Sequence, residues 1–312
     1  MKPAIIQIES MLPSVEATLA EHYDVHRLAG RADLDGLPAA ARAGIRAIVT
    51  GGGTGAAPAL IEALPQLEII TINGVGTDAV DLELCRSRGV RVTNTPDVLT
   101  DDVADLAVGL MLAVLRKLCL GDRFVRAGAW GKGKFALGSK MTGKRLGIVG
   151  LGRIGRAIAK RAGGFDMAIS YHDQRAFEDV PYRFEPSLRS LAHDSDILVV
   201  AASGGAGSRH LVDRTVMDAL GAKGILVNVA RGSIVDEQAL VEALLDGRLG
   251  GAGLDAFQNE PHVPEALFAL DQVVLEPHQA SATHETREAM GRLVTDNLAA
   301  HFAGRPLLTT VV

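Results

Sequence analysis

Aromatic residues are scarce in this sequence, and positively charged residues are not in excess. Phe, Trp and Tyr make up 4% of the 312 residues, whereas hydrophobic residues make up 47%. Lys and Arg total 32 against 37 Asp and Glu, which gives a formal net charge of -5. Proteins that bind nucleic acid use basic patches and stacking aromatic side chains, so we do not expect a nucleic-acid partner. The composition instead indicates a core of aliphatic strands and Ala-rich helices.

Cysteines and long apolar runs are also few. Cys85 and Cys119 are the two cysteines, and both occur in helix-like surroundings far apart in the sequence. We therefore expect reduced, buried thiols rather than a disulfide framework. The longest apolar run, "LAVGLMLAVL" at residues 106–115, is shorter than the roughly 20 residues that cross a bilayer. These features predict a cytoplasmic protein with no membrane partner.

Short β-rich runs alternate with helical patterns in two series along the chain. The first series covers residues 4–95, and the second begins with "KRLGIVG" at residue 144 and ends with "QVVLEPH". Such alternation predicts an α/β fold with two doubly wound parallel sheets, and the length favours two domains. A nearly continuous apolar helix from about residue 101 should be buried on several sides. Residues 121–143 are rich in Gly and Lys, so we expect a loop or arm there.

A glycine motif opens the second series. In "GIVGLGRIGRAIAKR", Gly150, Gly152 and Gly155 follow an apolar strand and precede a helix. The first glycine allows a tight turn, the second allows a pyrophosphate to approach the backbone, and the third allows the helix to pack on the strand. The helix N-terminus offers N–H groups and a positive dipole to the anion. We therefore expect a dinucleotide site; a plain structural turn is the alternative.

The end of the next strand, "ISYHDQR", carries conflicting signals for the choice of dinucleotide. Asp173 lies 18 residues after Gly155, where an acid would accept the ribose 2′-OH of NAD. Arg175, helped by His172 and Gln174, would instead pair with the 2′-phosphate of NADP. Both cofactors stay open, and a solvated turn pair of Asp173 and Arg175 is a third possibility.

Three chemically active residues follow strands of the second series. Arg231 follows "ILVNVA", Glu260 follows "GAGLDAFQN", and His278 follows "QVVLEP". Ligands of open α/β sheets bind beyond the carboxyl ends of the strands, so these side chains should converge on the cofactor. Arg231 can hold a carboxylate and a carbonyl oxygen, while His278 can donate a proton and Glu260 favours the imidazolium. Singly, each residue is more often structural.

The chain resembles the D-isomer-specific 2-hydroxyacid dehydrogenase family, and within it the glyoxylate/hydroxypyruvate reductase branch. The motifs that carry the resemblance are "INGVGTDAVDL", "VTNTPDVLTDDVADLAVGLML", "GIVGLGRIG", "NVARGSIVDE", "GAGLDAFQNEP" and "EPHQASAT". It implies a flavodoxin-like substrate domain, residues 1–98 with 286–312, and a Rossmann dinucleotide-binding domain, residues 99–285. It also implies a homodimer and reduction of a small 2-oxo acid, such as glyoxylate or hydroxypyruvate, by NADPH or NADH.

By the same resemblance, Arg231, Glu260 and His278 take the catalytic positions. Asp255 takes the position that holds the nicotinamide side. The substrate contacts implied are Gly74, Val75, Gly76, Arg231 and His278. The cofactor contacts implied by motif and resemblance together are Thr100, Gly150, Gly152, Arg153, Ile154, Gly155, His172, Asp173, Gln174, Arg175, Ala230 and Asp255. We expect no metal, because His278 and His284 are six residues apart and not at the helical i, i+4 spacing.

Two alternatives remain within the family. A D-3-phosphoglycerate dehydrogenase-like enzyme often carries an extra regulatory domain, and a corepressor-like NAD(H)-sensing protein depends on peptide-docking surfaces and extensions. We see little room for either in 312 residues and expect the reductase. The arm with Trp130 has two possible roles of equal weight: reaching the substrate site of a neighbouring subunit, as the resemblance implies, or ordinary interface packing.

Overall fold

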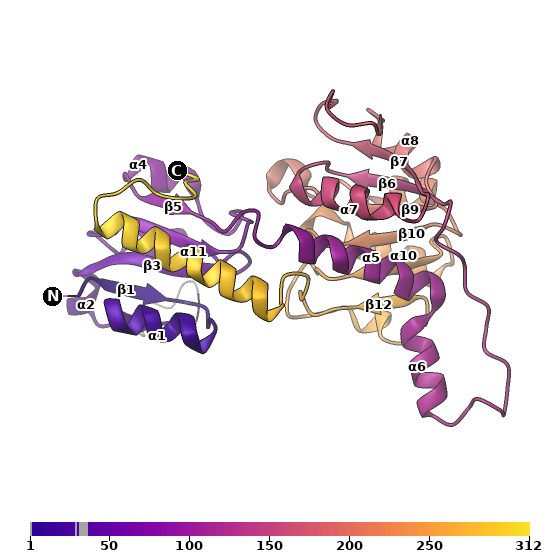
Figure 1. Cartoon of the computed structure of the whole chain (residues 1–312), viewed down its shortest axis with the longest axis horizontal. Coiled ribbons are helices and arrows are strands. Elements are labelled where there is room, and N and C mark those ends of the chain that lie inside the picture. Colours follow the sequence, from indigo (N-terminus) through magenta and orange to yellow (C-terminus); the bar gives the residue numbers. More distant parts are fainter. Residues whose placement is uncertain (1, 29, 31–36) are drawn as a thin grey trace. The chain divides into compact units, whose positions relative to one another are not determined.

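The chain folds into two compact units in a computed structural model that describes residues 2–28, 30 and 37–312 (Figure 1). The first unit combines Met1–Leu99 with Ala282–Val312, and the second is the continuous segment Thr100–Ser281. Each unit is built on one parallel sheet, so the predicted fold class is confirmed. Among the described residues, every helix is too short or too polar to span a bilayer.

The first unit has a five-stranded sheet in the order β2-β1-β3-β4-β5, with all neighbouring strands parallel. Its strands are β1 (Ala4–Gln7), β2 (Asp24–Arg27), β3 (Ile45–Gly51), β4 (Ile69–Asn73) and β5 (Arg91–Thr93). The chain reverses its direction of winding between β1 and β3. In open parallel sheets, such a reversal leaves a crevice at the carboxyl ends of the two strands.

Helices cover both faces of this sheet. The helices are α1 (Pro13–His22), α2 (Ala39–Arg42), α3 (Pro58–Glu62), α4 (Leu82–Ser87) and α11 (His284–Phe302). Successive strand residues point to opposite faces, so Ile5 packs in the core under α1 and α11, whereas Ile6 packs in the core with α3. A Cβ on Gly291 would lie 2.3 Å from Val15, which shows how closely α11 approaches α1.

The C-terminal tail, residues 303–312, runs beside β5 (Figure 1). Thr310 forms an antiparallel bridge with Thr93, and the N–H of Val311 donates to the carbonyl of Val92 at 2.8 Å. The tail therefore protects an otherwise open sheet edge.

The second unit has a seven-stranded parallel sheet in the order β12-β11-β10-β9-β6-β7-β8. The strands are β6 (Arg145–Val149), β7 (Ala168–His172), β8 (Arg183–Phe184), β9 (Ile197–Val200), β10 (Ile225–Asn228), β11 (Gly251–Leu254) and β12 (Val273–Leu275). All four residues of β9 and of β10 are buried, as expected for central strands with helices on both faces. The winding reverses between β6 and β9.

Two helices, α5 (Thr100–Arg116) and α7 (Arg153–Gly163), pack together on one face, and α5 also contacts β10, β11 and β12. This position explains the near-continuous apolar sequence of α5. The other face carries α8 (Leu188–His193), α9 (Arg214–Leu220) and α10 (Glu237–Leu245). The Asp236 carboxylate accepts the N–H of Ala239 and caps α10, and Gly247 follows the helix with a φ of 68°.

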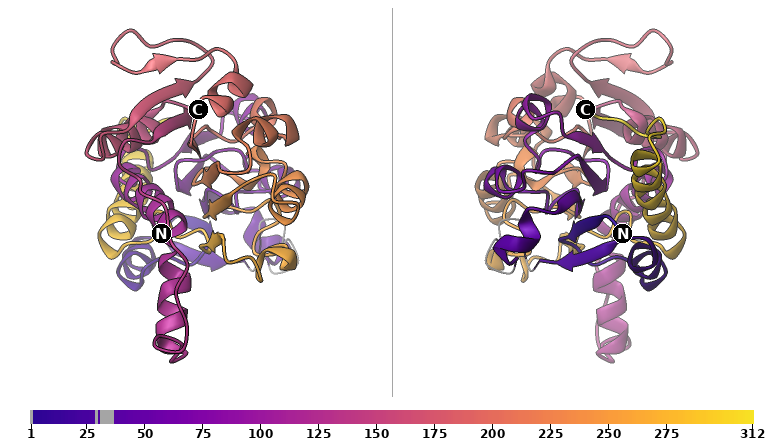
Figure 2. Two further views of the ribbon diagram at one scale, coloured as in Figure 1. Left: turned by 90° about the vertical axis from the view of Figure 1, so that its right-hand side faces the viewer. Right: turned by 90° about the vertical axis from the view of Figure 1, so that its left-hand side faces the viewer.

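Two predictions for this unit are wrong in part. Residues 118–126 form a helix, α6 (Leu118–Arg126), although we expected a loop from residue 121. The helix is stabilised by the Arg126 to Asp122 ion pair one turn apart, a signal that the glycine-rich composition concealed. With residues 127–138 it forms an arm that projects from its sheet in every view (Figure 2). Cys85 is buried as expected, but Cys119 is exposed because it lies on this arm.

Candidate active site

The glycine motif forms the tight connection from β6 to α7. Gly150 has a φ of 90°, and a Cβ there would lie 2.6 Å from the Cα of Ala202. A Cβ on Gly155 would lie 2.1 Å from the carbonyl oxygen of Gly150. In contrast, a Cβ on Gly152 would meet no described atom within 4 Å. Two glycines thus allow close packing, and the middle one leaves an open approach to the backbone.

The N-terminus of α7 is suited to an anion. Gly152 is the N-cap residue and has no side chain to accept the first N–H groups of the helix. Arg153 and Ile154 form the first turn. The helix dipole and these N–H groups favour a negatively charged ligand, and a pyrophosphate matches this donor set.

Asp173 lies just beyond β7 and contacts the glycine loop directly. Its Oδ2 accepts the backbone N–H of Leu151 at 2.8 Å, and its Oδ1 accepts the N–H of Gln174 at 2.7 Å. Each carboxylate oxygen retains capacity for a further hydrogen bond, such as one from a ribose hydroxyl. The neighbouring His172 is engaged elsewhere, because its Nδ1 lies 3.0 Å from the carbonyl of Glu185.

Two arginines gather on Phe177 in the loop after Asp173. The guanidinium carbons of Arg156 and Arg175 lie 4.8 and 5.5 Å from the centre of its ring. Arg156 also forms a two-point ion pair with Asp179, at 2.7 and 3.0 Å. We did not predict this cluster; the signal was an isolated aromatic residue among charges. The ring holds the Arg175 guanidinium beside the cofactor edge of the sheet.

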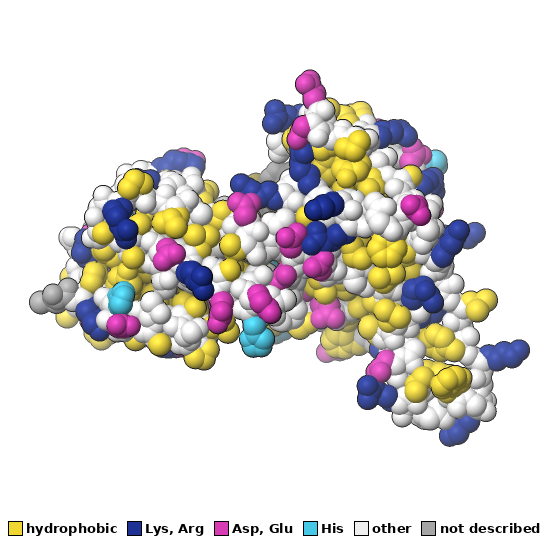
Figure 3. Space-filling model, viewed as in Figure 1, with side chains coloured by type: hydrophobic (Ala, Val, Ile, Leu, Met, Phe, Trp, Pro, Cys, Tyr) yellow, Lys and Arg dark blue, Asp and Glu magenta, His cyan; other side chains and the backbone are white. Residues whose placement is uncertain are grey.

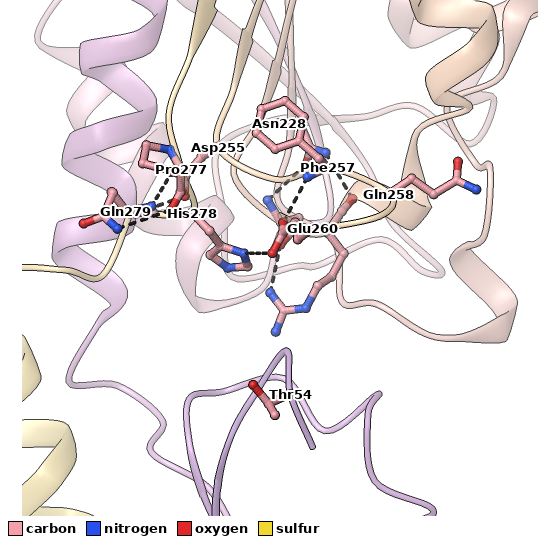
Figure 4. A network of polar contacts seen from close by, with 12 residues as sticks. Thr54, Asn228, Asp255, Phe257, Gln258, Glu260, Pro277, His278 and Gln279 are labelled. Atoms are coloured by element: carbon pink, nitrogen blue, oxygen red, sulfur yellow. Dashed lines mark hydrogen bonds and ion pairs between the residues drawn. The ribbon is translucent and has the colours of Figure 1, made fainter. Parts of the chain in front are cut away.

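Glu260 and His278 are brought together from two different loops. The imidazole Nδ1 of His278 lies 2.8 Å from Oε2 of Glu260, and the two side chains face each other in Figure 4. The other carboxylate oxygen, Oε1, accepts the N–H of Phe257 at 3.0 Å. The carboxylate is therefore fixed at both oxygens and orients the ring so that Nε2 is directed away from it.

The charge of Glu260 is maintained by its surroundings. Burial raises the pKa of Glu260, but the hydrogen bonds from His278 and Phe257 and the charges of His278 and Arg231 outweigh burial and hold the pKa below its usual value. Arg231 is therefore close enough to act on this carboxylate. The three residues form one electrostatic unit.

Asp255 holds the loop that carries His278. Its two oxygens accept the N–H groups of Gln279 at 2.6 Å and Ala280 at 3.0 Å (Figure 4). Burial raises the pKa of Asp255, whereas these two N–H groups and the charge of His278 oppose the rise. His278 itself has a φ of 54°, the left-handed region. Asp255 thus sets the backbone from which the imidazole projects.

Arg231 is placed by the strand that precedes it. Asn228, at the end of β10, donates from its side chain to the carbonyl of Arg231 at 3.0 Å and accepts the N–H of Ala230 at 3.0 Å. Arg231 Nη1 donates to the Ala230 carbonyl at 2.8 Å. A Cβ on Gly232 would lie 1.9 Å from the carbonyl carbon of Phe257, so only glycine lets this loop pack on the Glu260 loop.

Asn228 is a residue that the sequence argument missed. It is 1% exposed, a single amide at the end of the apolar run "ILVN". A buried polar residue in such a run needs hydrogen-bond partners, and this requirement was the available signal.

The remaining predicted residues lie at two other places. Gly74, Val75 and Gly76 follow β4 in the first unit, where the N–H of Gly74 donates to the Ile72 carbonyl at 3.0 Å. Thr100 is the first residue of α5. In the described part of the chain, no group of three His, Cys, Asp or Glu residues is arranged to hold a metal ion.

The fold and site define a protein with a dinucleotide-type glycine loop and a cluster of His, Glu and Arg. Comparisons with known proteins identify its family. Residues 108–280 match the D-isomer specific 2-hydroxyacid dehydrogenase, NAD binding domain. The chain is 57% identical over 271 residues to glyoxylate/hydroxypyruvate reductase A of Arabidopsis thaliana, covering 87% of each chain. It is 46% identical over 311 residues to 2-ketogluconate reductase of Gluconobacter oxydans strain 621H, covering 100% of this chain and 99% of the relative.

A solved structure gives the same result. The NADPH-dependent glyoxylate/hydroxypyruvate reductase of Sinorhizobium meliloti, in complex with NADP and malonate, is 43% identical and matches with a TM-score of 0.95, covering 100% of this chain and 97% of that one. The chain belongs to the D-isomer specific 2-hydroxyacid dehydrogenase family. The resemblance read from the motifs, including the glyoxylate/hydroxypyruvate reductase branch, is confirmed.

Proposed function

We propose that the protein reduces a small 2-oxo acid to the 2-hydroxy acid with NADPH or NADH. The observation that carries the proposal is the 2.8 Å contact of His278 Nδ1 with Glu260, next to the charge of Arg231. An imidazole held by a carboxylate can donate a proton to an oxygen, and a guanidinium can stabilise negative charge on that oxygen. Relatives named glyoxylate, hydroxypyruvate, hydroxyphenylpyruvate and 2-ketogluconate reductases support this reaction class.

Each member of the cluster has a distinct role in this proposal. Arg231 binds the substrate carboxylate and carbonyl oxygen and polarises the carbonyl. His278 donates its Nε2 proton to the carbonyl oxygen as the C2 carbon is reduced. Glu260 keeps the imidazole charged and aligned through Nδ1. The backbone of Gly74, Val75 and Gly76 binds the substrate carboxylate.

The dinucleotide is held by the second unit. Bound NADPH or NADH supplies the hydride that C2 accepts. The glycine loop and the first turn of α7 bind the pyrophosphate, and Asp255 and Thr100 lie on the nicotinamide side. The full set of proposed contacts is Thr100, Gly150, Gly152, Arg153, Ile154, Gly155, His172, Asp173, Gln174, Arg175, Ala230 and Asp255.

The choice between NADPH and NADH rests on Asp173 and Arg175. An additional hydrogen bond from a ribose hydroxyl to Asp173 favours NADH, because this carboxylate repels a 2′-phosphate. Arg175 offers a cation for the 2′-phosphate and is held on Phe177. We therefore propose that both cofactors are used, with relative rates set by these two residues.

A second copy of the chain is the proposed partner of the arm, residues 118–138. The arm carries large exposed apolar side chains: Leu118 and Val125 are each 54% exposed, Trp130 78% and Leu137 93%. Hydrophobic side chains are visible on the arm in Figure 3. Apolar groups gathered on one projection mark an interaction surface.

Two unpaired thiols further support a cytoplasmic location.

A crossed rate panel tests the proposal. NADPH and NADH are each combined with glyoxylate, hydroxypyruvate, pyruvate and phenylpyruvate, and the absorbance of the reduced nicotinamide is followed. We expect turnover with at least one 2-oxo acid and its loss in His278→Asn, with cofactor binding retained. Cofactor binding without turnover on any 2-oxo acid would support a sensor instead. Oxidation of 3-phosphoglycerate in preference to reduction of all four acids would support the phosphoglycerate dehydrogenase alternative.

A further inference from the structure

Two consecutive peptide groups of the loop after β4 are held by the segment after β5. The side-chain Nδ2 of Asn94 donates to the carbonyl of Val75 at 2.8 Å. The backbone N–H of Thr95 donates to the carbonyl of Gly74 at 2.9 Å. Both carbonyls of the loop therefore point toward residues 94 and 95.

These two bonds also fix the directions of two N–H groups. In a planar trans peptide, the N–H of the following residue points opposite to the carbonyl. The Gly74 carbonyl thus sets the direction of the Val75 N–H, and the Val75 carbonyl sets that of the Gly76 N–H. Among the hydrogen bonds of the described residues, none uses either N–H as a donor. The loop presents two donors on the side away from Asn94.

Asn94 is in turn fixed by the C-terminal tail. The hydroxyl of Thr309 donates to the Asn94 carbonyl at 2.6 Å, although the two residues are 215 positions apart in the sequence. The hydroxyl also accepts a hydrogen bond from Nδ2 of Asn297 at 2.9 Å. Oδ1 of Asn297 accepts the N–H groups of Leu308 at 3.0 Å and Thr309 at 3.3 Å.

Asn297 is a rigid base for this chain of bonds. It lies in the middle of α11, is 1% exposed, and shares its Nδ2 with the Leu293 carbonyl at 2.8 Å. A buried amide with both ends bonded has a single orientation. A continuous series of hydrogen bonds therefore runs from α11 through Thr309 and Asn94 to the peptide of Val75.

We propose that Thr309 and Asn94 are positioning residues through which the C-terminal tail orients the Val75 and Gly76 N–H groups toward the substrate carboxylate. The inference rests on the proposed function, because it assigns the loop to substrate binding. The tail then determines substrate affinity without touching the substrate. Its effect falls on the KM for the 2-oxo acid, not on the KM for the dinucleotide.

Three threonine variants test the proposal. Thr309→Val keeps the shape of the side chain but removes both hydroxyl bonds, and Thr309→Ser restores them. Thr295→Val is the matched control, because that hydroxyl bonds only within α11, to the Arg292 carbonyl. We expect Thr309→Val to raise the KM for the 2-oxo acid about 3- to 10-fold, the size of one hydrogen bond, with kcat at saturating substrate within about twofold. The serine variant and the control should match the wild type.

A second measurement reads the loop without turnover. The amide nitrogen resonance of Gly76 is sensitive to the hydrogen bond at the preceding carbonyl, that of Val75. In ¹⁵N-labelled protein it should move in Thr309→Val, return in Thr309→Ser and stay in place in Thr295→Val. In Asn94→Ala, which removes the direct donor, adding Thr309→Val should produce little further change, because the threonine acts through Asn94.

The outcomes separate the two proposals. A Gly76 resonance that does not respond to Thr309→Val, or a KM equal to that of the wild type, overturns the inference. A rise in the KM for the dinucleotide together with a loss of thermal stability would also overturn it, since this combination indicates a general structural role. A resonance that moves as expected in a protein that reduces no 2-oxo acid would establish the orientation of the loop and reject the proposed function.

Discussion

The carboxylate of Asp173 accepts the backbone N–H of Leu151 at 2.8 Å and so ties the end of β7 to the glycine loop. This acid would disfavour a 2′-phosphate through its charge. In Asp173→Asn we expect the ratio of kcat/KM for NADPH over NADH to rise about tenfold, the scale of one charge-assisted hydrogen bond. Asp194→Asn should leave the ratio unchanged, because Asp194 precedes the amino end of β9 and pairs with Arg183 and His193, whereas Asp173 follows the carboxyl end of β7. An unchanged ratio in Asp173→Asn would remove this residue from cofactor choice.

Glu260→Gln should affect the reaction through His278. The amide keeps the shape of the side chain but removes the negative charge that stabilises the protonated imidazole. We expect kcat for reduction to fall about 10- to 100-fold and activity to decline at a lower pH than in the wild type. Because the pKa of Glu260 is held below its usual value, the wild-type carboxylate stays charged across neutral pH. A kcat–pH profile that superimposes on that of the wild type would contradict this role.

Gly232→Ala should disturb the packing of the loop that carries Arg231 on the loop that carries Glu260. The added methyl group would lie 1.9 Å from the Phe257 carbonyl carbon, so the Arg231 loop must move away from the Glu260 loop. We expect a loss of about 1–3 kcal/mol in the free energy of unfolding and of about 100-fold in kcat/KM. Gly163→Ala, where the methyl group meets no described atom within 4 Å, is the control. Urea unfolding and steady-state kinetics measure both effects.

Glu16 should make stability depend on pH in the acidic range. The guanidinium of Arg27, the N–H of Met11 and the amide of Gln7 bind its carboxylate, and the pKa of Glu16 falls to about 2 from its ordinary 4.5. Its contribution is therefore complete above pH 4.5 and disappears as the pH falls toward 2.

The matching variant is Glu16→Gln. At pH 7 we expect it to lower the free energy of unfolding by about 1 kcal/mol, a value reduced for solvent screening of a surface pair. The difference from the wild type should shrink steadily below pH 4.5. Glu83→Gln, at an exposed pair on α4, should change little at any pH. A difference for Glu16→Gln that persists at low pH would rule out this linkage.

Polar substitutions on the arm should disrupt the proposed dimer. A double variant, Val125→Asp with Leu137→Asp, introduces two charges into the surface that a second copy would cover. We expect sedimentation velocity to show monomers for it and dimers for the wild type. Leu245→Asp, at an apolar side chain that is 57% exposed on α10, should remain dimeric. If the wild type itself sediments as a monomer, the arm has another partner.

The sequence predicted the sheets because their signals are local. Strands such as "ILVV" are apolar throughout, and the glycine motif is a single short run between the end of a strand and the start of a helix. Strand ends also indicated where Arg231, Glu260 and His278 would gather. The topology of an open parallel sheet places such ends along one edge.

Long-range contacts and exposed helices could not be predicted in this way. No local pattern relates Thr309 to Asn94, because the bond depends on the return of the chain to the first unit. α6 has no buried residue, because its apolar side chains, such as Leu118 and Val125, lie against no core of the described chain, and Cys119 is exposed with them. The contact of Arg156 with the Phe177 ring is also not local, because Arg156 lies in α7 and Phe177 in the loop after β7.

The late return of the chain to its first unit also bears on synthesis by the ribosome. Residues 1–99 are translated before α11 and Thr310, yet one face of their sheet packs against α11, and β5 pairs with Thr310. Residues 100–281 carry a complete sheet, and all of them leave the exit tunnel before α11 does. Since domains fold as units during translation, the segment made second should fold first. A message truncated before α11 would yield a nascent chain in which Ile5 and Leu19 lack the cover of Val294 and Leu298, a target for chaperones and proteases.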